Sequence, residues 1–156
     1  MRSFIGTSNC KMDAKYRIVV HSKFTSFSQD DQEKSIATLV ANVSPDKCID
    51  LFSEEAWTEV EEMLLLKFNE GSSKDRKNLS RFLDFAERLS IDNSGRITIP
   101  ARMVEFAGLK KEVTLKGKLN KLQLWDAETY ELMMKGNQAG FDDIVADLYG
   151  GQSVSD

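Results

Sequence analysis

A short motif occurs twice in the 156-residue chain, and this repetition constrains the fold more than any other feature. Residues 13–22 read DAKYRIVVHS and residues 92–101 read DNSGRITIPA, so an aspartate, three residues, an arginine and a β-branched run recur 79 positions apart. A second correspondence follows in the same order, because LFSEEAW at 51–57 aligns with LWDAETY at 124–130. Two matches in the same order predict an internal duplication of two similar halves.

Each copy of the motif precedes a similar series of predicted elements. In the second half, ITIP favours a short strand, and ARMVEFAG is typical of a short helix that begins after Pro100 and ends at Gly108. Apolar and polar residues then alternate from 112 to 125 around a turn near 117–120, which predicts a β-hairpin. Asp126 is a candidate N-cap for the helix that follows.

The first half carries a parallel series. RIVV, IATLVANV and KCIDLF are predicted strands, and Ser53 is predicted to cap a helix. The apolar residues of this helix recur at helical spacing and are expected to face the core: Trp57, Val60, Leu64 and Phe68. Because such short strands cannot bury an apolar face within one half, we expect a mixed α+β fold in which the halves pair around one shared, barrel-like core.

A third amphipathic helix is predicted between the halves, in GSSKDRKNLSRFLDFAERL. Ser72 or Ser73 is its candidate N-cap. Its apolar residues recur at helical spacing: Leu79, Phe82, Leu83, Ala86 and Leu89. Its Lys and Arg residues form either a DNA-facing row or a face that is solvated or meets a neighbouring subunit. The segment after residue 140 is acidic, and we expect its last several residues to be mobile.

The composition disfavours several classes of protein. Apolar residues make up 41% and charged residues 29%, which is typical of a soluble globular protein. The chain has no apolar run long enough for a membrane helix, and its N-terminus lacks the apolar core of a signal peptide, so we expect a cytoplasmic protein. The common enzyme motifs are absent, His21 is the only histidine, and Cys10 and Cys48 lack a CxxC spacing. An enzyme is therefore disfavoured, and both thiols are expected to be reduced packing residues.

Charge is segregated along the chain. The net charge of −4 argues against a nucleic-acid partner, but the two stretches that contain the motif are basic. Residues 1–36 carry six Lys and Arg against four Asp and Glu, and residues 92–121 carry seven against three. Residues 37–91 carry seven against eleven, and residues 122–156 carry one against seven. A basic face is therefore compatible with an acidic total.

Together these motifs resemble the MraZ family of bacterial transcription regulators. DNSGRITIPA, EFAGL at 105–109 and LWDAETY stand where that family's pattern has them, and FIG at 4–6 is similar to the family's N-terminal F-x-G. The resemblance covers about residues 4–135. Its specificity depends on the doubled motif and its spacing, since a single DxxxR would carry no information.

The resemblance implies two tandem AbrB-like swapped-hairpin half-barrels that form one pseudo-symmetric β-barrel with flanking helices. The expected parts are a first half at 1–70, a connecting amphipathic helix at 71–90, a second half at 91–140 and an acidic tail at 141–156. The resemblance also implies a ring-shaped homo-oligomer that binds short direct repeats in double-stranded DNA upstream of the division and cell wall gene cluster, as a nucleoid-associated repressor. No cofactor, metal, membrane or small-molecule substrate is expected.

The resemblance places the family's DxxxR motif on Asp13 and Arg17 in the first half and on Asp92 and Arg96 in the second. An arginine just past a tight turn suits either a phosphate or a guanine edge, and the sequence does not distinguish the two. The aspartates fit the first position of a turn, with Gly95 where positive φ is tolerated, and each aspartate could also bridge to its arginine. The other candidate DNA-binding residues are basic neighbours: Lys11, Lys15 and Arg102.

The first copy of the motif departs from the family's pattern, because Tyr16 replaces a glycine and His21 a proline. A tyrosine at positive φ costs roughly 1 to 2 kcal/mol, so we expect the first turn to have another shape or a compensating contact. Tyr16 either packs against the protein or stacks on DNA or on an adjacent subunit. His21 is expected at a helix start or on the surface.

Three other functions stay open beside the DNA-binding regulator. The degenerate first motif is compatible with an assembly or interaction protein that keeps the ring but has lost operator binding. An AbrB-like antitoxin whose tail wraps a toxin is a third possibility, although those proteins are usually single half-barrels. An enzyme is the least favoured, and it would require turnover that depends on Asp13 or Asp92.

Overall fold

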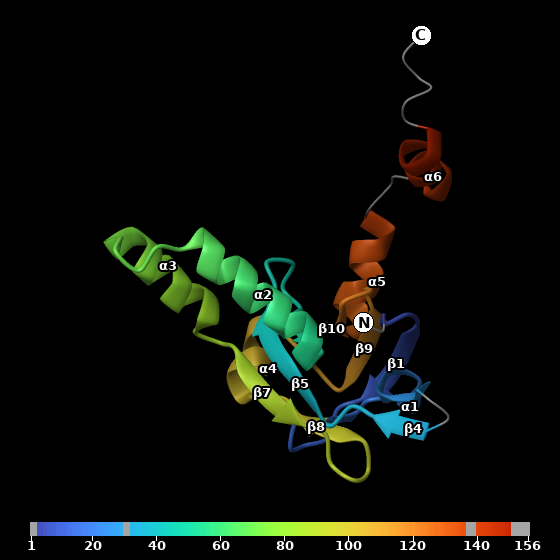
Figure 1. Cartoon of the computed structure of the whole chain (residues 1–156). Helices are drawn as coiled ribbons and strands as arrows, with labels where there is room; N and C mark the ends of the chain where they lie inside the picture. Colours follow the sequence, from blue (N-terminus) through green and yellow to red (C-terminus); the bar gives the residue numbers. More distant parts are fainter. Residues whose placement is uncertain (1–2, 30–31, 137–139, 151–156) are drawn as a thin grey trace.

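The computed structural model describes residues 3–29, 32–136 and 140–150 (Figure 1). Its elements in chain order are β1 (Thr7–Lys11), β2 (Arg17–Val19), α1 (Ser22–Thr25), β3 (Ser26–Gln29), β4 (Gln32–Ser35), β5 (Thr38–Val43), β6 (Ile49–Phe52), α2 (Glu54–Lys67), α3 (Ser73–Leu83), β7 (Glu87–Ser90), β8 (Arg96–Thr98), α4 (Ala101–Ala107), β9 (Glu112–Gly117), β10 (Lys121–Asp126), α5 (Ala127–Gly136) and α6 (Phe141–Gly150).

Most strands belong to one open antiparallel sheet of order β1-β9-β10-β6-β5-β7. In two separate ribbons, β2 pairs with β8 and β3 pairs with β4. The predicted mixed α+β class is confirmed. The predicted β-barrel is not observed among the described residues. The sheet stays open because β1 and β7 are the two ends of the order, and the three-residue strands β2 and β8 pair with each other instead of extending the sheet.

Each half of the chain pairs its first strand with the hairpin of the other half. β1 pairs with β9, where Cys10 lies opposite Val113, and β7 pairs with β5, where Leu39 lies opposite Leu89. β6 and β10 join the two hairpins in the middle of the sheet. Both halves follow the order strand, strand, short helix, hairpin and helix, with β3 and β4 as an addition to the first half. The two halves therefore share one sheet.

One apolar core serves both halves. Its largest fully buried side chains come from both halves of the chain, before and after α3 in the sequence: Ile18, Phe24, Leu39, Ile49, Leu51, Ile97, Ile99, Met103, Leu115, Leu122 and Leu124. Burying a side chain of this size contributes roughly 1.5 to 3 kcal/mol relative to leaving it exposed. The shared core predicted from the short strands is confirmed.

The elements predicted for the second half are also confirmed. α4 begins after Pro100 and ends at Gly108, whose φ of 60° is left-handed. β9 and β10 form the predicted hairpin, with Leu115 opposite Leu124. Asp126 starts α5, since its carboxylate accepts a hydrogen bond from the Thr129 backbone N–H at 3.3 Å.

α2 begins as predicted at Ser53, whose hydroxyl accepts from the Ala56 backbone N–H at 3.1 Å. Trp57 and Leu64 are buried, and Val60 packs against the same small cluster as Trp57. Phe68 is the C-cap residue and is half-buried. One face of α2 therefore covers the sheet near β5 and β6.

α3 is shorter than predicted. It begins after Ser72, whose hydroxyl accepts from the Asp75 backbone N–H, and it ends at Leu83. Leu89 is buried in β7, not on the helix, because β7 pairs with β5. No side chain of α3, all of which is described, is buried by the chain itself.

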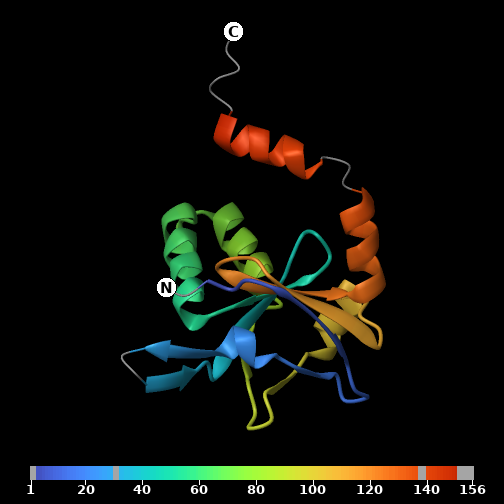
Figure 2. The ribbon, with the colours of Figure 1, turned by 90° about the vertical axis from the view of Figure 1, so that its right-hand side faces the viewer.

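The segment predicted to be only an acidic tail contains helix α6. Figures 1 and 2 show α6 apart from the sheet, beyond the end of α5. The residues expected to be mobile, 151–156, lie outside the described residues. Within the described ranges, no helix is both long and apolar enough to cross a membrane.

Candidate nucleic-acid interface

The two copies of the motif fold into turns with the same hydrogen bonds. In the first turn, Oδ1 of Asp13 accepts from the backbone N–H groups of Lys15 and Arg17, both at 2.9 Å. In the second, Oδ1 of Asp92 accepts from the backbone N–H groups of Ser94 at 2.8 Å and Arg96 at 2.9 Å. An aspartate side chain that bonds the backbone two residues on stabilises a turn. The turn-forming role predicted for the aspartates is observed in both halves.

The second carboxylate oxygen of each aspartate holds the arginine. Nε of Arg17 lies 2.7 Å from Oδ2 of Asp13, and Nε of Arg96 lies 3.3 Å from Oδ2 of Asp92. Within the described ranges, the terminal guanidinium nitrogens of both arginines have no hydrogen-bond partner. The bridge across the turn therefore holds each guanidinium at Nε. The two terminal nitrogens stay available to a planar anion.

These hydrogen bonds favour the ionised carboxylates. The pKa of Asp13 lies below its ordinary value, chiefly because the Arg17 backbone N–H donates to the carboxylate. The pKa of Asp92 is lowered in the same way, chiefly by the Arg96 backbone N–H. Both aspartates are therefore charged at neutral pH, and both turns keep their ion pair.

Tyr16 adopts the same left-handed conformation as Gly95, with φ of 62° against 78°. Of the two alternatives expected for the first turn, another shape is wrong, and a compensating contact is left. A matched pair of bonds holds both residues, since the Tyr16 carbonyl accepts from the Ile99 N–H at 2.8 Å and the Gly95 carbonyl accepts from the Val20 N–H at 2.8 Å. Each turn is thus held by the residue just after the strand that follows the other turn.

The ribbon of β2 and β8 brings the two arginines together. Arg17 lies opposite Thr98, and Val19 lies opposite Arg96. The two arginines are therefore diagonal neighbours, whose Cα atoms are expected to be about 7 to 8 Å apart in an antiparallel pair. Side chains alternate along a strand, so both arginines share the face opposite the buried isoleucines of the ribbon. Figures 1 and 2 show both turns at the end of the molecule opposite α6.

The other predicted DNA-binding residues are less closely grouped. Lys15 is exposed within the first turn, and Lys11 is exposed at the end of β1. Arg102 projects from α4 to Asp84, with Nη2 2.7 Å from Oδ2, and its guanidinium stacks 4.3 Å from the centre of the Phe85 ring. The structure therefore gives Arg102 partners outside the two turns.

Two residues that share the arginine face were missed from the sequence. Val19 and Thr98 are exposed and alternate with the buried isoleucines, so they line the same face as Arg17 and Arg96. The alternation within RIVV and RITI carried this signal. An exposed valine methyl and threonine hydroxyl add an apolar and a hydrogen-bonding group beside the guanidiniums.

The lone histidine and the two cysteines have local roles. His21 is the N-cap of α1, since its Nδ1 accepts from the Lys23 N–H at 3.0 Å, which confirms the predicted position at a helix start. Cys10 and Cys48 are free, and burial raises the pKa of Cys48 to about 12. In the described part of the chain, no cluster of His, Cys, Asp and Glu is placed to hold a metal ion.

The fold and the turns define a class of protein: a chain of two similar α+β halves that share one sheet and present two arginine-bearing turns on one ribbon. Residues 82–150 match the family model described as "MraZ protein, putative antitoxin-like". This segment, which contains the second turn and α6, is similar to that family. The match confirms the resemblance inferred from the sequence motifs.

Proposed function

We propose that the chain is a sequence-specific DNA-binding transcriptional regulator. The observation that carries the proposal is the β2–β8 ribbon, which places Arg17 and Arg96 on one exposed face with their outer nitrogens unpaired among the described residues. A guanidinium already held at Nε loses little further conformational entropy when its terminal nitrogens bind a phosphate or a guanine. Lys11, Lys15 and Arg102 are proposed as supporting contacts, and Asp13, Asp92 and Gly95 as residues that hold the turns.

The family match supports the finer features of the proposal. We propose that each half is an AbrB-like swapped-hairpin unit and that several chains form a ring. In such a ring, many copies of the arginine face meet short direct repeats upstream of the division and cell wall genes, where the protein represses transcription on the nucleoid. Contacts that are weak singly combine through effective concentration when several sites bind one DNA.

The proposed boundaries keep the predicted halves with one adjustment. The first half spans 1–70 and the second half reaches 140, but β7 pairs with β5 and leads into the second turn. We therefore assign β7 to the second half and limit the connection, predicted at 71–90, to α3 and the residues just after it.

The test is a salt titration of binding to a fragment from the protein's own upstream region. The compared chains are the native protein, Arg17→Ala, Arg96→Ala and the control Lys67→Ala, which removes a charge from the last turn of α2. If each arginine contacts a phosphate, its loss lowers the salt slope by about one. The control leaves the slope unchanged, and thermal melts show whether either arginine variant loses stability instead.

A second candidate is an assembly protein that has lost operator binding. The exposed apolar residues of α3 and α6 favour it, because they offer surfaces to other chains. The same salt titration distinguishes the two candidate functions. A native chain that binds its own upstream DNA no better than random DNA would favour the assembly protein and overturn the regulator.

A further inference from the structure

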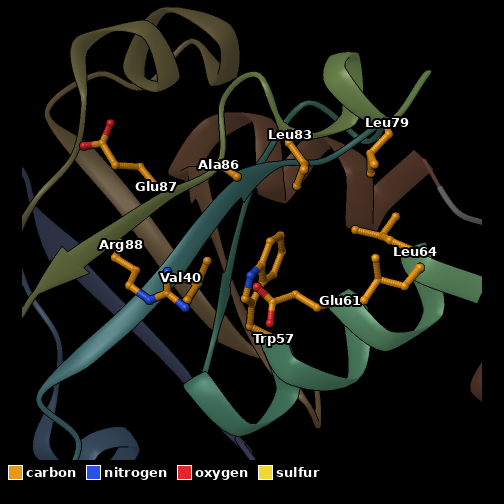
Figure 3. Close-up of a pocket in the computed structure, with 10 residues that line it drawn as sticks. Val40, Trp57, Glu61, Leu64, Leu79, Leu83, Ala86, Glu87 and Arg88 are labelled. Carbon is orange, nitrogen blue, oxygen red and sulfur yellow. The ribbon is translucent and has the colours of Figure 1, made fainter. Parts of the chain in front are cut away.

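An open apolar groove lies between α2 and α3 above the edge of the sheet. It encloses about 570 Å³. Its lining is Val40, Trp57, Glu61, Leu64, Leu65, Leu79, Leu83, Ala86, Glu87 and Arg88. Figure 3 shows Leu79 and Leu83 directed from the α3 side toward Trp57 and Leu64 of α2. We call this the α2–α3 groove.

The chain itself leaves the groove partly uncovered. Leu65 is 75% exposed and Leu83 is 38% exposed, and Phe82 beside them is 42% exposed. Large apolar side chains that stay exposed in a contiguous patch indicate a binding surface more often than a free one. The groove therefore has room for an apolar helix face from outside.

Helix α6 has the complementary feature, an apolar stripe without a partner in the described part of the chain. Phe141, Ile144, Val145 and Leu148 recur at helical spacing. No side chain of α6 is buried, and Leu148 is 69% exposed. In Figures 1 and 2, α6 lies beyond α5 and apart from α2 and α3 of its own chain.

The charges of the two helices are opposite. α6 carries three aspartates and no Lys or Arg, whereas α3 carries four Lys and Arg against one aspartate. At about 100° per residue, Asp142 and Asp147 flank the apolar stripe of α6, and Arg76 flanks that of α3. The acidic residues of the groove, Glu61 and Glu87, lie on its α2 and β7 sides. This distribution favours an approach of the acidic helix along α3.

We propose that α6 of one copy docks in the α2–α3 groove of a second copy. The two helices match in length, since α6 has 10 residues and α3 has 11. Such a contact uses different surfaces on the two partners, so it repeats from chain to chain and closes into a ring when the rotation permits. The inference rests on the ring assembly in the proposed function and names the surfaces that build it.

The test is the molar mass of the full chain by light scattering, without DNA. Three leucine-to-aspartate substitutions at similarly exposed positions are compared. They are Leu65→Asp in the groove, Leu148→Asp on α6, and the control Leu132→Asp on α5, at 75%, 69% and 65% exposure. The native chain and the control are expected to form the same assembly of several chains. The groove and α6 variants are each expected to fall to the mass of one chain.

Mixing the two deficient variants tests whether the docking is between chains. The intact α6 of Leu65→Asp can enter the intact groove of Leu148→Asp, so the mixture is expected to give a two-chain complex. A mixture that stays at one chain's mass would overturn docking between copies. A single-chain native protein, a native mass for Leu148→Asp or Leu65→Asp, or a control that also dissociates would each overturn it as well.

The outcome is independent of DNA recognition. Arg17→Ala and Arg96→Ala lie outside both surfaces and are expected to keep the native mass. If these variants lose specific binding while Leu148→Asp keeps its assembly, the regulator stands and the α6 contact is wrong. If Leu148→Asp dissociates while native protein binds no DNA specifically, the contact stands and the regulator is wrong.

Discussion

The first and second turns differ in sequence at the position where φ is positive, yet they have the same conformation. Tyr16 and Gly95 occupy that position with φ of 62° and 78°. Both turns share the aspartate bonds to the backbone and the bridge to the arginine. The comparison teaches that glycine lowers the cost of this turn but is not what determines its shape.

The shape is determined by contacts between the halves. The carbonyl of Tyr16 or Gly95 in one turn accepts a hydrogen bond from the backbone N–H just after the strand that follows the other turn. A residue in a sparsely populated backbone region persists when the surroundings over-determine it. Tyr16 is held in this way, and the strain of roughly 1 to 2 kcal/mol is offset elsewhere in the ribbon and its core.

The largest expected effect comes from the core beneath both turns. Ile18 and Ile97 face each other in the ribbon and are almost completely buried, at 1% and 0% exposure. Ile97→Ala and Ile18→Ala are each expected to lower the free energy of unfolding by about 2 to 5 kcal/mol, through lost burial and the cavity left behind. Chemical denaturation measures both values. If one substitution were nearly neutral, the two turns would not share a single support.

A smaller loss of stability is expected when a side chain is added at the positive-φ position of the second turn. Gly95→Ala keeps φ positive but adds a Cβ, which would lie 3.7 Å from the Val20 carbonyl oxygen, an ordinary contact. The cost is therefore the backbone strain alone, about 1 to 2 kcal/mol. Gly136→Ala at the end of α5 is the control, since a Cβ there meets open space and φ is not in the left-handed region. Equal stability of the two variants would contradict the account of the turn.

The aspartate bridges predict a dependence of stability on pH at the acidic end. Because the folded-state pKa of both Asp13 and Asp92 is below the ordinary 3.8, their stabilisation is fully present above that value. It is lost as the pH falls through the lowered folded-state pKa. Asp13→Asn with Asp92→Asn keeps an acceptor for the turns but cannot titrate. The double variant is expected to lose less stability than the native chain over this window, as thermal melts at stepwise lower pH would show.

Local patterns predicted the parts of the fold that depend on neighbouring residues. Ser53, Asp126 and one of the two candidates Ser72 and Ser73 were predicted as helix starts, because a cap needs only residues within the first turn. Gly108 ended α4 for the same reason. The duplication also predicted that both halves contribute to one core.

Long-range contacts decided two of the features that sequence reasoning missed. Leu89 fits helical spacing after Leu83 but forms part of β7, because β7 pairs with β5 in the sheet. Arg102 was placed beside Arg96 by its sequence position, whereas its guanidinium pairs with Asp84. α6 was missed because its acidic composition concealed an apolar stripe. The outcomes for Leu89 and Arg102 are set by residues distant in sequence, whereas the stripe of α6 was a local signal that was overlooked.

The smallest expected effect is the reverse change, Tyr16→Gly. It relieves a strain of roughly 1 to 2 kcal/mol, but the added freedom of the unfolded chain offsets about 0.4 to 1 kcal/mol of that gain. Tyr16 is 39% exposed, so the contacts that its side chain loses offset part of the remaining gain. We expect stability to change by less than about 1 kcal/mol, measured by denaturation.

Tyr16→Gly also distinguishes the two possible roles of the tyrosine side chain, which are packing against the protein and stacking on DNA. If Tyr16 only packs, the variant binds upstream DNA as the native chain does, because the aspartate and the ribbon still hold Arg17. If the ring stacks on DNA, binding weakens while the salt slope is unchanged, since stacking neutralises no phosphate. Tyr16→Asn is the matched control, because asparagine tolerates positive φ better than most residues and also removes the ring. A loss of binding in Tyr16→Gly that Tyr16→Asn does not share would point to the backbone and not to the ring, and the two turns would then differ in function through conformation alone.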